Sequence, residues 1–373
     1  MSIFAEMKKN FSDIVALIQA REHAKLESKL PSWAGTPGLE IPSSLALEQC
    51  SSESAALYKA SLLECGSVAD LDSGLGVDDW AFALKSREVH YNELNADLAA
   101  AAQRNFDLLG LENIICSNLD ASQALRQLGQ VDLIYMDPAR RSADGRKVFL
   151  LEDCSPNVIA LLPEIWEHCS TLMLKVSPMA DITMLSSRLR GLCEIHVVAL
   201  DGECKELLCI VRKGYEGPYL ITAVELSNAE TTSFDPAENT PAPLCGDIKK
   251  GNLLLEPKAS ILKTGQFGTI CSRWSLSQLD TSTHLFLDKT GDSNAPDAFF
   301  RRFRVVEILP FGKAAFRTAG ERYPNSDVTA RNIPMSSEEL KKRMGISGSR
   351  EYHIFGTCIS GERRIVVTER IRP

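Results

Sequence analysis

Residues 67–78, SVADLDSGLGVD, contain a short apolar run, a turn with two glycines and the start of a helical segment. Small residues at a strand-to-helix turn let a ligand come close to the backbone. The free N–H groups at the following helix N-terminus can bind polar groups of that ligand. Gly74 and Gly76 alone are weak evidence for a ligand site, so the interpretation depends on the segments that follow them.

Short apolar runs alternate with helix-length segments after this turn. The amphipathic segments 95–109, 121–129 and 156–168 separate several of these runs, and such alternation is typical of a parallel, doubly wound sheet. Only DGECK (201–205) joins the last two runs, which predicts an antiparallel hairpin because parallel strands need a connection of about a dozen residues. The expected strands are Ser67–Leu71, Glu88–Asn92, Asn113–Cys116, Val131–Met136, Thr171–Val176, Glu194–Leu200 and Glu206–Val211.

Acidic residues stand at the ends of the first four predicted strands, at Asp70, Glu93, Asp120 and Asp137. They are expected to converge, because ligands of open α/β sheets bind at the carboxyl ends of the strands. An acid about 20 residues after the first turn can accept hydrogen bonds from ribose hydroxyls. The alternative is that these acids are helix N-caps, which explains Asp120 more readily than the whole set. A nicotinamide dinucleotide site would have a third glycine where this chain has Asp79.

Other segments flank this predicted sheet. Apolar positions in residues 3–27 have a period near 3.6 and predict an amphipathic helix, and residues 44–64 predict a helical region that leads into the first strand. The polar, proline-containing segment 227–243 predicts a linker or a long loop. Residues 252–300 mix short strands with a helix, and residues 303–373 predict strand, helix, strand, helix and a final hairpin.

The composition is that of an ordinary globular protein, with 373 residues, 44% hydrophobic and 24% charged, so two or three domains are expected. The chain has no apolar run of about 18 residues and has charges throughout its opening segment, which favours a cytoplasmic protein without a membrane partner. The 11 cysteines form no C-x-x-C pair and the 6 histidines show no metal spacing. Neither disulfides nor a metal site is therefore expected.

Several segments resemble motifs of S-adenosylmethionine-dependent class I methyltransferases, whose sheet also ends in an antiparallel hairpin. In chain order they are DLDSGLG (70–76), NELN (92–95), NLDA (118–121) and YMDPARR (135–141). Further segments resemble a bacterial methyltransferase family that ends in a THUMP-like domain, preceded by a small ferredoxin-like piece. They are LEQCSSESAALYKASL (47–62), LLEDCSPN (150–157), LKVSPMADI (174–182) and ARNIPMSSEELKKRMGI (330–346), so the resemblance covers nearly the whole chain.

This resemblance implies an α/β fold with a Rossmann-like, seven-stranded class I methyltransferase sheet and an antiparallel terminal hairpin. It also implies a helical N-terminal extension, a ferredoxin-like piece and a C-terminal THUMP-like α/β domain. The expected boundaries are 1–62 for the extension, 63–215 for the methyltransferase domain, 216–251 for a strand and linker, 252–302 for the ferredoxin-like piece and 303–373 for the THUMP-like domain.

The resemblance implies S-adenosylmethionine as the cofactor. By position, Glu93 would hold the ribose hydroxyls, Asp120 would meet the adenine amino group, and the residues of the first loop would line the methionine and ribose side. Asp72 stands where many members of the superfamily have glycine, and it either stabilises the sulfonium centre or faces away from it. The expected cofactor-binding residues are Asp70, Asp72, Gly74, Gly76, Asp78, Glu93 and Asp120.

The motif that starts at Asp137 corresponds to the D/N-P-P-Y/F position of amino-group methyltransferases. In those enzymes the first residue accepts hydrogen bonds from the target nitrogen and the aromatic residue stacks on the base. Here Ala139 and Arg140 replace the second proline and the aromatic residue, which puts methylation of an exocyclic amine in doubt. Asp137 is expected to position the acceptor, and Arg140 and Arg141 either bind a phosphate or form an internal ion pair.

Carbon-5 methylation of a pyrimidine generally needs a cysteine nucleophile. Ser177 stands where some such enzymes carry cysteine, and Cys154 has no histidine close in sequence to activate it. Direct transfer without a covalent intermediate is therefore expected.

The C-terminal segment is basic, because residues 301–373 contain 15 Lys and Arg against 8 Asp and Glu in a chain of net charge -8. This asymmetry is typical of a nucleic-acid-facing module or of a solvated basic surface. Tyr323 and Tyr352 are possible stacking partners for bases, and Ser336 with Glu339 fits a capping box at a helix start. The candidates for RNA phosphate contact are Arg317, Arg322, Arg331, Lys341, Lys342 and Arg343, of which the last three can equally stabilise a helix C-terminus.

The sequence thus predicts a cytoplasmic, S-adenosylmethionine-dependent methyltransferase that acts on a base in structured RNA, tRNA or rRNA, by direct transfer. Two alternatives remain at this point. One is a methyltransferase of a small molecule or a protein, and the other is a non-catalytic RNA-binding protein that retains the cofactor fold.

Overall fold

The computed structural model describes residues 23–140, 151–348 and 351–371. The chain forms two compact units, Met1–Glu194 with Glu206–Gly217 and Ile195–Lys205 with Pro218–Pro373, and each is described by itself. Within the described ranges, none of the helices has both the length and the apolar character that a bilayer crossing requires.

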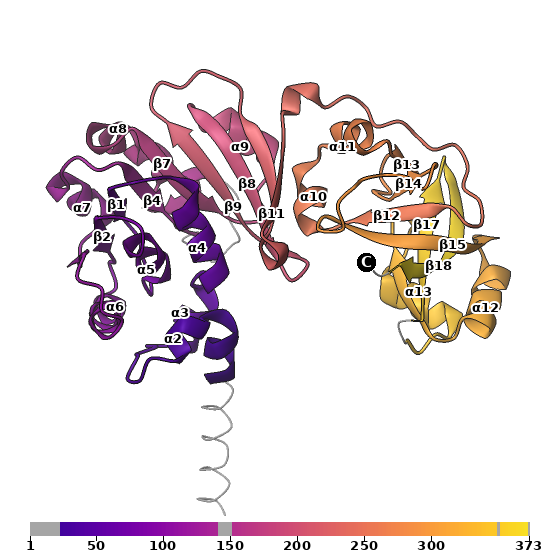
Figure 1. Cartoon of the computed structure of the whole chain (residues 1–373), viewed down its shortest axis with the longest axis horizontal. Helices are drawn as coiled ribbons and strands as arrows, with labels where there is room; N and C mark the ends of the chain where they lie inside the picture. The colour runs from indigo at the N-terminus through magenta and orange to yellow at the C-terminus, as the bar shows by residue number, and fades with distance from the viewer. Residues whose placement is uncertain (1–22, 141–150, 349–350, 372–373) are drawn as a thin grey trace, which may run out of the picture. The chain divides into compact units, whose positions relative to one another are not determined.

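A nine-stranded sheet has the order β11-β10-β8-β9-β7-β4-β1-β2-β3 (Figure 1). β1 pairs in parallel with β2 and β4, β2 with β3, and β4 with β7, whereas β9 runs antiparallel to β7. This arrangement confirms the predicted α/β fold with a Rossmann-like sheet. The strands are β1 (Ser67–Asp70), β2 (Glu88–Asn92), β3 (Ile114–Ser117), β4 (Leu133–Met136), β7 (Thr171–Val176), β8 (Leu192–Leu200), β9 (Glu203–Arg212), β10 (Leu220–Glu225) and β11 (Glu230–Phe234).

Polar side chains fix the starts of most helices in the first unit by capping free backbone N–H groups. Ser43, Ser52, Asn95, Asn157 and Asp181 each accept a hydrogen bond from an N–H in the first turn of the helix that follows. The predicted helical region 44–64 is two helices, because Ser52 begins a second one after a break. The helices are α2 (Pro31–Ala34), α3 (Ser44–Gln49), α4 (Glu53–Leu62), α5 (Val77–Ala83), α6 (Ala96–Leu108), α7 (Ala121–Gln127), α8 (Val158–His168) and α9 (Ile182–Arg188), and residues 23–29 are also helical.

The core of the first unit joins the sheet to the N-terminal helices. Trp33 of α2 and Trp80 of α5 make an edge-to-face contact with ring centroids 6.3 Å apart. Tyr91 of β2 packs edge-to-face on Phe106 of α6 at 5.5 Å. The first pair holds α5 against α2, and the second holds α6 against β2.

The predicted antiparallel hairpin is confirmed between β8 and β9, which are neighbours in the sheet. Asp201 and Gly202 alone connect them, with φ angles of 55° and 82°. Two consecutive residues of positive φ form the tight turn that matches the twist of antiparallel strands, and Asp-Gly is a preferred pair for it. Ser360 and Gly361 connect the last two strands of the chain in the same way, with φ angles of 47° and 85°.

The prediction of a linker or loop over 227–243 is wrong for its first part. Residues Glu230–Phe234 form β11, which pairs antiparallel with β10. The segment reads as polar because β11 is the last strand of its sheet, and most of its side chains are exposed. An edge strand of this kind needs only β-branched residues such as Thr231 and Thr232 and one apolar anchor, Phe234, which is buried.

The second unit has a seven-stranded sheet of order β13-β14-β12-β15-β18-β17-β16 (Figure 1). Pairing is antiparallel except between β16 and β17, and three buried apolar clusters pack on the sheet. The predicted order of strand, helix, strand, helix and hairpin after residue 300 is confirmed. The elements are β12 (Leu253–Pro257), α10 (Ala259–Thr264), α11 (Phe267–Trp274), β13 (Ser277–Gln278), β14 (Phe286–Asp288), β15 (Phe300–Pro310), α12 (Lys313–Arg322), β16 (Ser326–Ala330), α13 (Ser337–Met344), β17 (Tyr352–Ile359) and β18 (Glu362–Ile371).

Candidate functional site

The loop between β1 and α5 is shaped by its two glycines. Both have positive φ, 61° at Gly74 and 80° at Gly76, a region that side chains disfavour. A Cβ at Gly76 would lie 2.4 Å from the ring of Phe106, whereas a Cβ at Gly74 would meet no atom within 4 Å. Gly76 is therefore required for packing, and Gly74 leaves open space beside the loop.

Glu93, at the carboxyl end of β2, is tied to this loop. One oxygen of its carboxylate accepts a hydrogen bond from the Gly74 N–H at 2.9 Å and the other accepts from the Asn95 N–H at 2.7 Å. The Tyr91 hydroxyl donates to the Gly74 carbonyl at 2.7 Å. The structure thus places Glu93 beside the first loop, and its contact with ribose hydroxyls stays a prediction.

Three carboxyl groups, those of Asp70, Asp72 and Asp79, are gathered at the base of the loop. Burial first, and the neighbouring carboxylates second, raise the pKa of Asp70 and of Asp79 well above the ordinary value. Among the described residues, no Lys or Arg lies within ion-pair distance of these three groups, and one buried oxygen each of Asp72 and Asp79 has no hydrogen-bond partner. Such a group of uncompensated carboxyls is suited to a ligand that carries positive charge.

Asp72 faces the end of β4 rather than away from the site. Its Oδ1 accepts a hydrogen bond from the Asp137 N–H at 2.9 Å. Burial, and next the charge of Asp137, raise the pKa of Asp72 from 3.8 to about 8. Asp72 therefore connects the carboxyl ends of β1 and β4. Its second oxygen, Oδ2, is buried and has no hydrogen-bond partner among the described residues.

Asp78, which we expected to bind cofactor, belongs to a buried ion-pair network. Its carboxylate lies 2.9 Å from Lys59 Nζ and accepts hydrogen bonds from Ser51 at 2.8 Å and Tyr135 at 2.9 Å. Lys59 Nζ is also 3.1 Å from Glu206 of β9. Asp78 lies in the first turn of α5, which packs on α4, and its carboxylate is held by these partners; its contact with a cofactor stays a prediction.

Asp137, the expected acceptor-positioning residue, is paired with Lys175. The Lys175 ammonium contacts Asp137 Oδ2, and the side chains are 13% and 38% exposed. Burial opposes the charge on Lys175, but the carboxylates of Asp137, Glu206 and Asp78 outweigh it and raise the Lys175 pKa above its ordinary value. The sequence analysis did not identify three residues of this network, Lys175, Lys59 and Glu206. The position of Lys175 near the end of the apolar strand TLMLKV could have indicated a functional lysine.

The remaining residues of the predicted site are placed as follows. Asp120 is exposed at the N-terminus of α7 and accepts a hydrogen bond from the Ser122 N–H at 3.0 Å, as the capping alternative expected. Ala139 and Arg140 form β5, a two-residue strand that pairs with β6 (Cys154–Ser155). Arg141 lies outside the described residues. Asp120 therefore caps a helix, and its contact with an adenine stays a prediction.

Four of the six predicted RNA-contacting cations are in ion pairs within the second unit. The partners are Glu321 for Arg317, Glu307 for Arg322, Glu256 for Arg331 and Glu339 for Arg343. Lys341 and Lys342 lie in the last turn of α13, whose first turn is capped by Ser336 accepting from the Glu339 N–H at 3.1 Å. Tyr323 and Tyr352 contact each other with ring centroids 5.0 Å apart.

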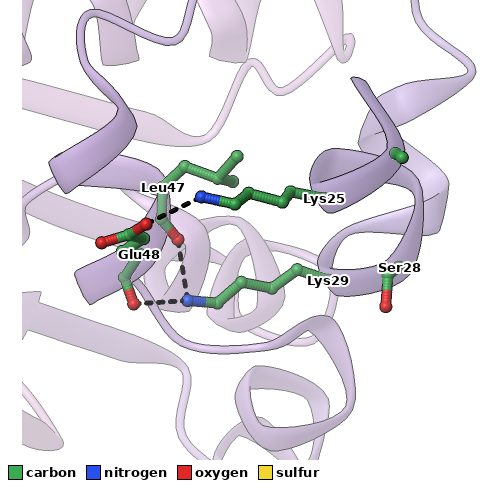
Figure 2. Close-up of a pocket in the computed structure, with 6 residues that line it drawn as sticks. Lys25, Ser28, Lys29, Leu47 and Glu48 are labelled. Atoms are coloured by element: carbon green, nitrogen blue, oxygen red, sulfur yellow. Dashed lines mark hydrogen bonds and ion pairs between the residues drawn. The ribbon is translucent and has the colours of Figure 1, made fainter. Parts of the chain in front are cut away.

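A surface hollow lies between the helix at 23–29 and α3, and Figure 2 shows its lining. Lys25 Nζ is 2.7 Å from the Glu48 carboxylate, and Lys29 Nζ donates to the carbonyls of Leu47 at 2.7 Å and Glu48 at 2.8 Å. Burial, the largest influence, lowers the pKa of Lys29. These lysines hold the N-terminal helices together, and the hollow has none of the carboxyl groups found at the ends of β1, β2 and β4. Within the described ranges, no cluster of His, Cys, Asp or Glu side chains has the arrangement of a metal site.

Comparisons with known proteins agree with this architecture. Residues 254–296 match a ferredoxin-like domain family and residues 300–370 match the family "THUMP domain-like". The crystal structure of a "putative methyltransferase from Porphyromonas gingivalis W83" is similar over 95% of this chain and 89% of that chain, with 31% sequence identity and a TM-score of 0.84.

Two more distant structures resemble part of the chain. TrmN from Thermus thermophilus has 18% identity and a TM-score of 0.31 over 43% of this chain and 48% of its own. Trm5b from Pyrococcus abyssi has 14% identity and a TM-score of 0.33 over 44% of this chain and 49% of its own. No curated protein matches. With the sheet, both domain matches and the full-length relative in agreement, the chain belongs to the class I S-adenosylmethionine-dependent methyltransferase family that carries a C-terminal THUMP-like domain.

Proposed function

We propose that this protein is an S-adenosylmethionine-dependent methyltransferase that acts on structured RNA, tRNA or rRNA, by direct transfer. The observation that carries the proposal is the group of uncompensated carboxyls beside an open glycine loop, next to the half-exposed Asp137. The name of the full-length relative supports the reaction type.

The residues at the loop fit this cofactor. A sulfonium is a cation, and the second oxygen of the buried Asp72 carboxyl, Oδ2, has no hydrogen-bond partner among the described residues. Gly74 leaves open space at the loop, and Glu93 presents a carboxylate that can accept hydrogen bonds from ribose hydroxyls. We propose that Asp70, Asp72, Gly74 and Glu93 hold the cofactor, with Gly76 shaping the loop.

When bound, the cofactor supplies a methyl group that its sulfonium charge already activates. The protein then has to orient an acceptor, exclude water and take up a proton. Asp137 is the carboxylate best placed to contact an acceptor. Its backbone N–H donates a hydrogen bond to Asp72, and its side chain is partly exposed. We propose that Asp137 contacts the acceptor and that Arg140 and Arg141 bind a substrate phosphate.

We propose that the second unit presents the RNA, in the domain organisation expected from the sequence. The matches at 254–296 and 300–370 support the last two boundaries of that organisation. Lys341 and Lys342 are the best candidates for phosphate contact, because the four predicted arginines already have carboxylate partners. The same ion pairs favour the alternative of a small-molecule or protein methyltransferase, which needs no basic surface.

The test is transfer of labelled methyl to RNA from cells that lack the gene. We expect incorporation by the wild type and by Asp107→Ala, a control at an exposed aspartate of α6. Asp137→Ala should reduce incorporation by at least 100-fold, because it removes the carboxylate at the acceptor, while calorimetric cofactor affinity changes less than about threefold. Equal loss of binding and transfer would contradict this division of roles. Cofactor binding without any transfer to RNA would favour the alternatives.

A further inference from the structure

The chemistry of the acceptor can be inferred from what surrounds Asp137. The parallel pairing of β4 with β7 places Met136 opposite Leu174, so Asp137 and Lys175 lie side by side just beyond it. Lys175 contacts one oxygen of the Asp137 carboxylate, Oδ2, and the Asp137 side chain is 38% exposed. An acceptor that reaches Asp137 therefore meets a carboxylate and an ammonium together.

The buried network behind this pair keeps Lys175 charged. Glu206 and Asp78 raise its pKa together with Asp137, although burial acts in the opposite direction. Lys59, which is completely buried, fixes both of these carboxylates at distances of 2.9 and 3.1 Å. β9 carries Glu206 and pairs with β7, which carries Lys175, so this strand pair connects the network to the site.

An exocyclic base amine suits this arrangement poorly. Its N–H₂ group, like an amide N–H₂, donates hydrogen bonds, and an ammonium has three donors and no acceptor. Lys175 would therefore oppose such an amine and would also compete with it for the Asp137 carboxylate. The residues that follow Asp137, Pro138 and Ala139, have no aromatic side chain on which a base could stack.

A hydroxyl suits the same arrangement well. It can donate its proton to the Asp137 oxygen that Lys175 does not contact and at the same time accept a hydrogen bond from the Lys175 ammonium. We propose that the methyl acceptor is a hydroxyl. This inference rests on the proposed function, and in RNA the hydroxyl available at every nucleotide is the ribose 2′-hydroxyl. The sequence-based expectation names a base as the acceptor, so the two differ in the atom that is methylated.

The step balances with the groups present. The hydroxyl oxygen forms a bond to the methyl carbon, the bond from that carbon to sulfur breaks, and its electron pair stays on sulfur. The hydroxyl proton passes to the Asp137 carboxylate and later to solvent. Lys175 acts as a catalytic residue here, because its ammonium stabilises the negative charge that develops on the oxygen.

The experiment combines the position of the label with variants of Lys175. A 2′-O-methyl group blocks alkaline cleavage of the adjoining phosphodiester, so label should appear in alkali-resistant dinucleotides, whereas base methylation would leave it in mononucleotides. Lys175→Gln should lower kcat by about 100- to 1000-fold with unchanged cofactor affinity, and Lys175→Arg should retain more activity. Lys85→Gln, at an exposed lysine of the same unit, is the control.

A measurement without turnover tests the pair itself. In the cofactor-free protein with ¹³C-labelled lysine, the Lys175 side chain should stay protonated above pH 10.5, and Asp137→Asn should lower its pKa. A Lys175 pKa below 10.5 in the wild type would contradict the ion pair between Lys175 and Asp137.

The outcomes separate the two proposals. Label in mononucleotides, or undiminished transfer by Lys175→Gln, would overturn the hydroxyl acceptor and leave an RNA methyltransferase. Label only in a protein or small molecule would overturn the RNA assignment, and the bond would then decide the hydroxyl inference: O-methyl supports it, and N-methyl or S-methyl overturns it.

Discussion

The ionisation of Asp72 should make recognition of the sulfonium depend on pH. The Asp72 pKa is raised from 3.8 to about 8, so in the cofactor-free protein this carboxyl is largely neutral at pH 6 and half ionised near pH 8. A cation binds the ionised form more tightly. S-Adenosylhomocysteine has the same adenosine and amino acid parts but a neutral thioether, so comparing the two ligands isolates the charge of the sulfur.

The magnitude follows from the fraction of Asp72 that is ionised. Below pH 8 that fraction falls about tenfold per pH unit, so the preference for S-adenosylmethionine over S-adenosylhomocysteine should rise by up to about 50-fold between pH 6 and pH 8 and level off above it. Calorimetric titration of both ligands at several pH values measures this ratio. Asp72→Asn, which keeps the acceptor for the Asp137 N–H, should give a low ratio that does not change with pH.

Protein stability provides an independent measure of the same ionisation. A raised carboxyl pKa contributes stability that is complete below 3.8 and is lost as pH rises through about 8. Asp72→Asn removes this loss, so the cofactor-free variant should unfold at a higher temperature than the wild type at pH 8. A ligand ratio independent of pH in the wild type, or an equal pH response in Asp72→Asn, would refute the role assigned to Asp72.

Two further predictions concern the packing around the site. Lys59→Ala removes the ammonium that pairs with two buried carboxylates, and it should lower the free energy of unfolding by denaturant by about 3–5 kcal/mol. Lys25→Ala breaks an exposed pair and should lower it by about 0–1 kcal/mol. Equal losses of stability would show that the buried network is not needed. Gly76→Ala adds a clash with Phe106 to a strain of about 1–2 kcal/mol, and Gly74→Ala adds the strain alone. Thermal unfolding should therefore rank Gly76→Ala as the less stable, and the reverse order would contradict the geometry of the loop.

The fold could be predicted from the sequence because its signals are local. Alternating apolar runs gave the strands of the first sheet, and the short link at 201–205 required a hairpin. β11 could not be predicted in the same way, since an edge strand buries little and its threonines and serine resemble a loop. The break between α3 and α4 also escaped prediction, although Ser52 is a favourable N-cap.

The site could be predicted only in part, because its decisive contacts join residues far apart in sequence. Asp72 and Asp137 follow separate strands whose ends converge, which the alternation predicts. Lys59 and Glu206 are separated by 147 positions, and nothing local indicates that they form one network with Asp78. The tail shows the same difficulty, since its net positive charge does not reveal that Arg331 is paired with the buried Glu256.

A crystal structure of the protein with S-adenosylmethionine would test the central claim most directly. The account predicts the ribose hydroxyls within hydrogen-bond distance of the Glu93 carboxylate, the sulfonium beside Asp72, and the methyl group directed toward Asp137 and Lys175. A cofactor bound away from the β1 loop, or a methyl group directed away from Asp137, would contradict it.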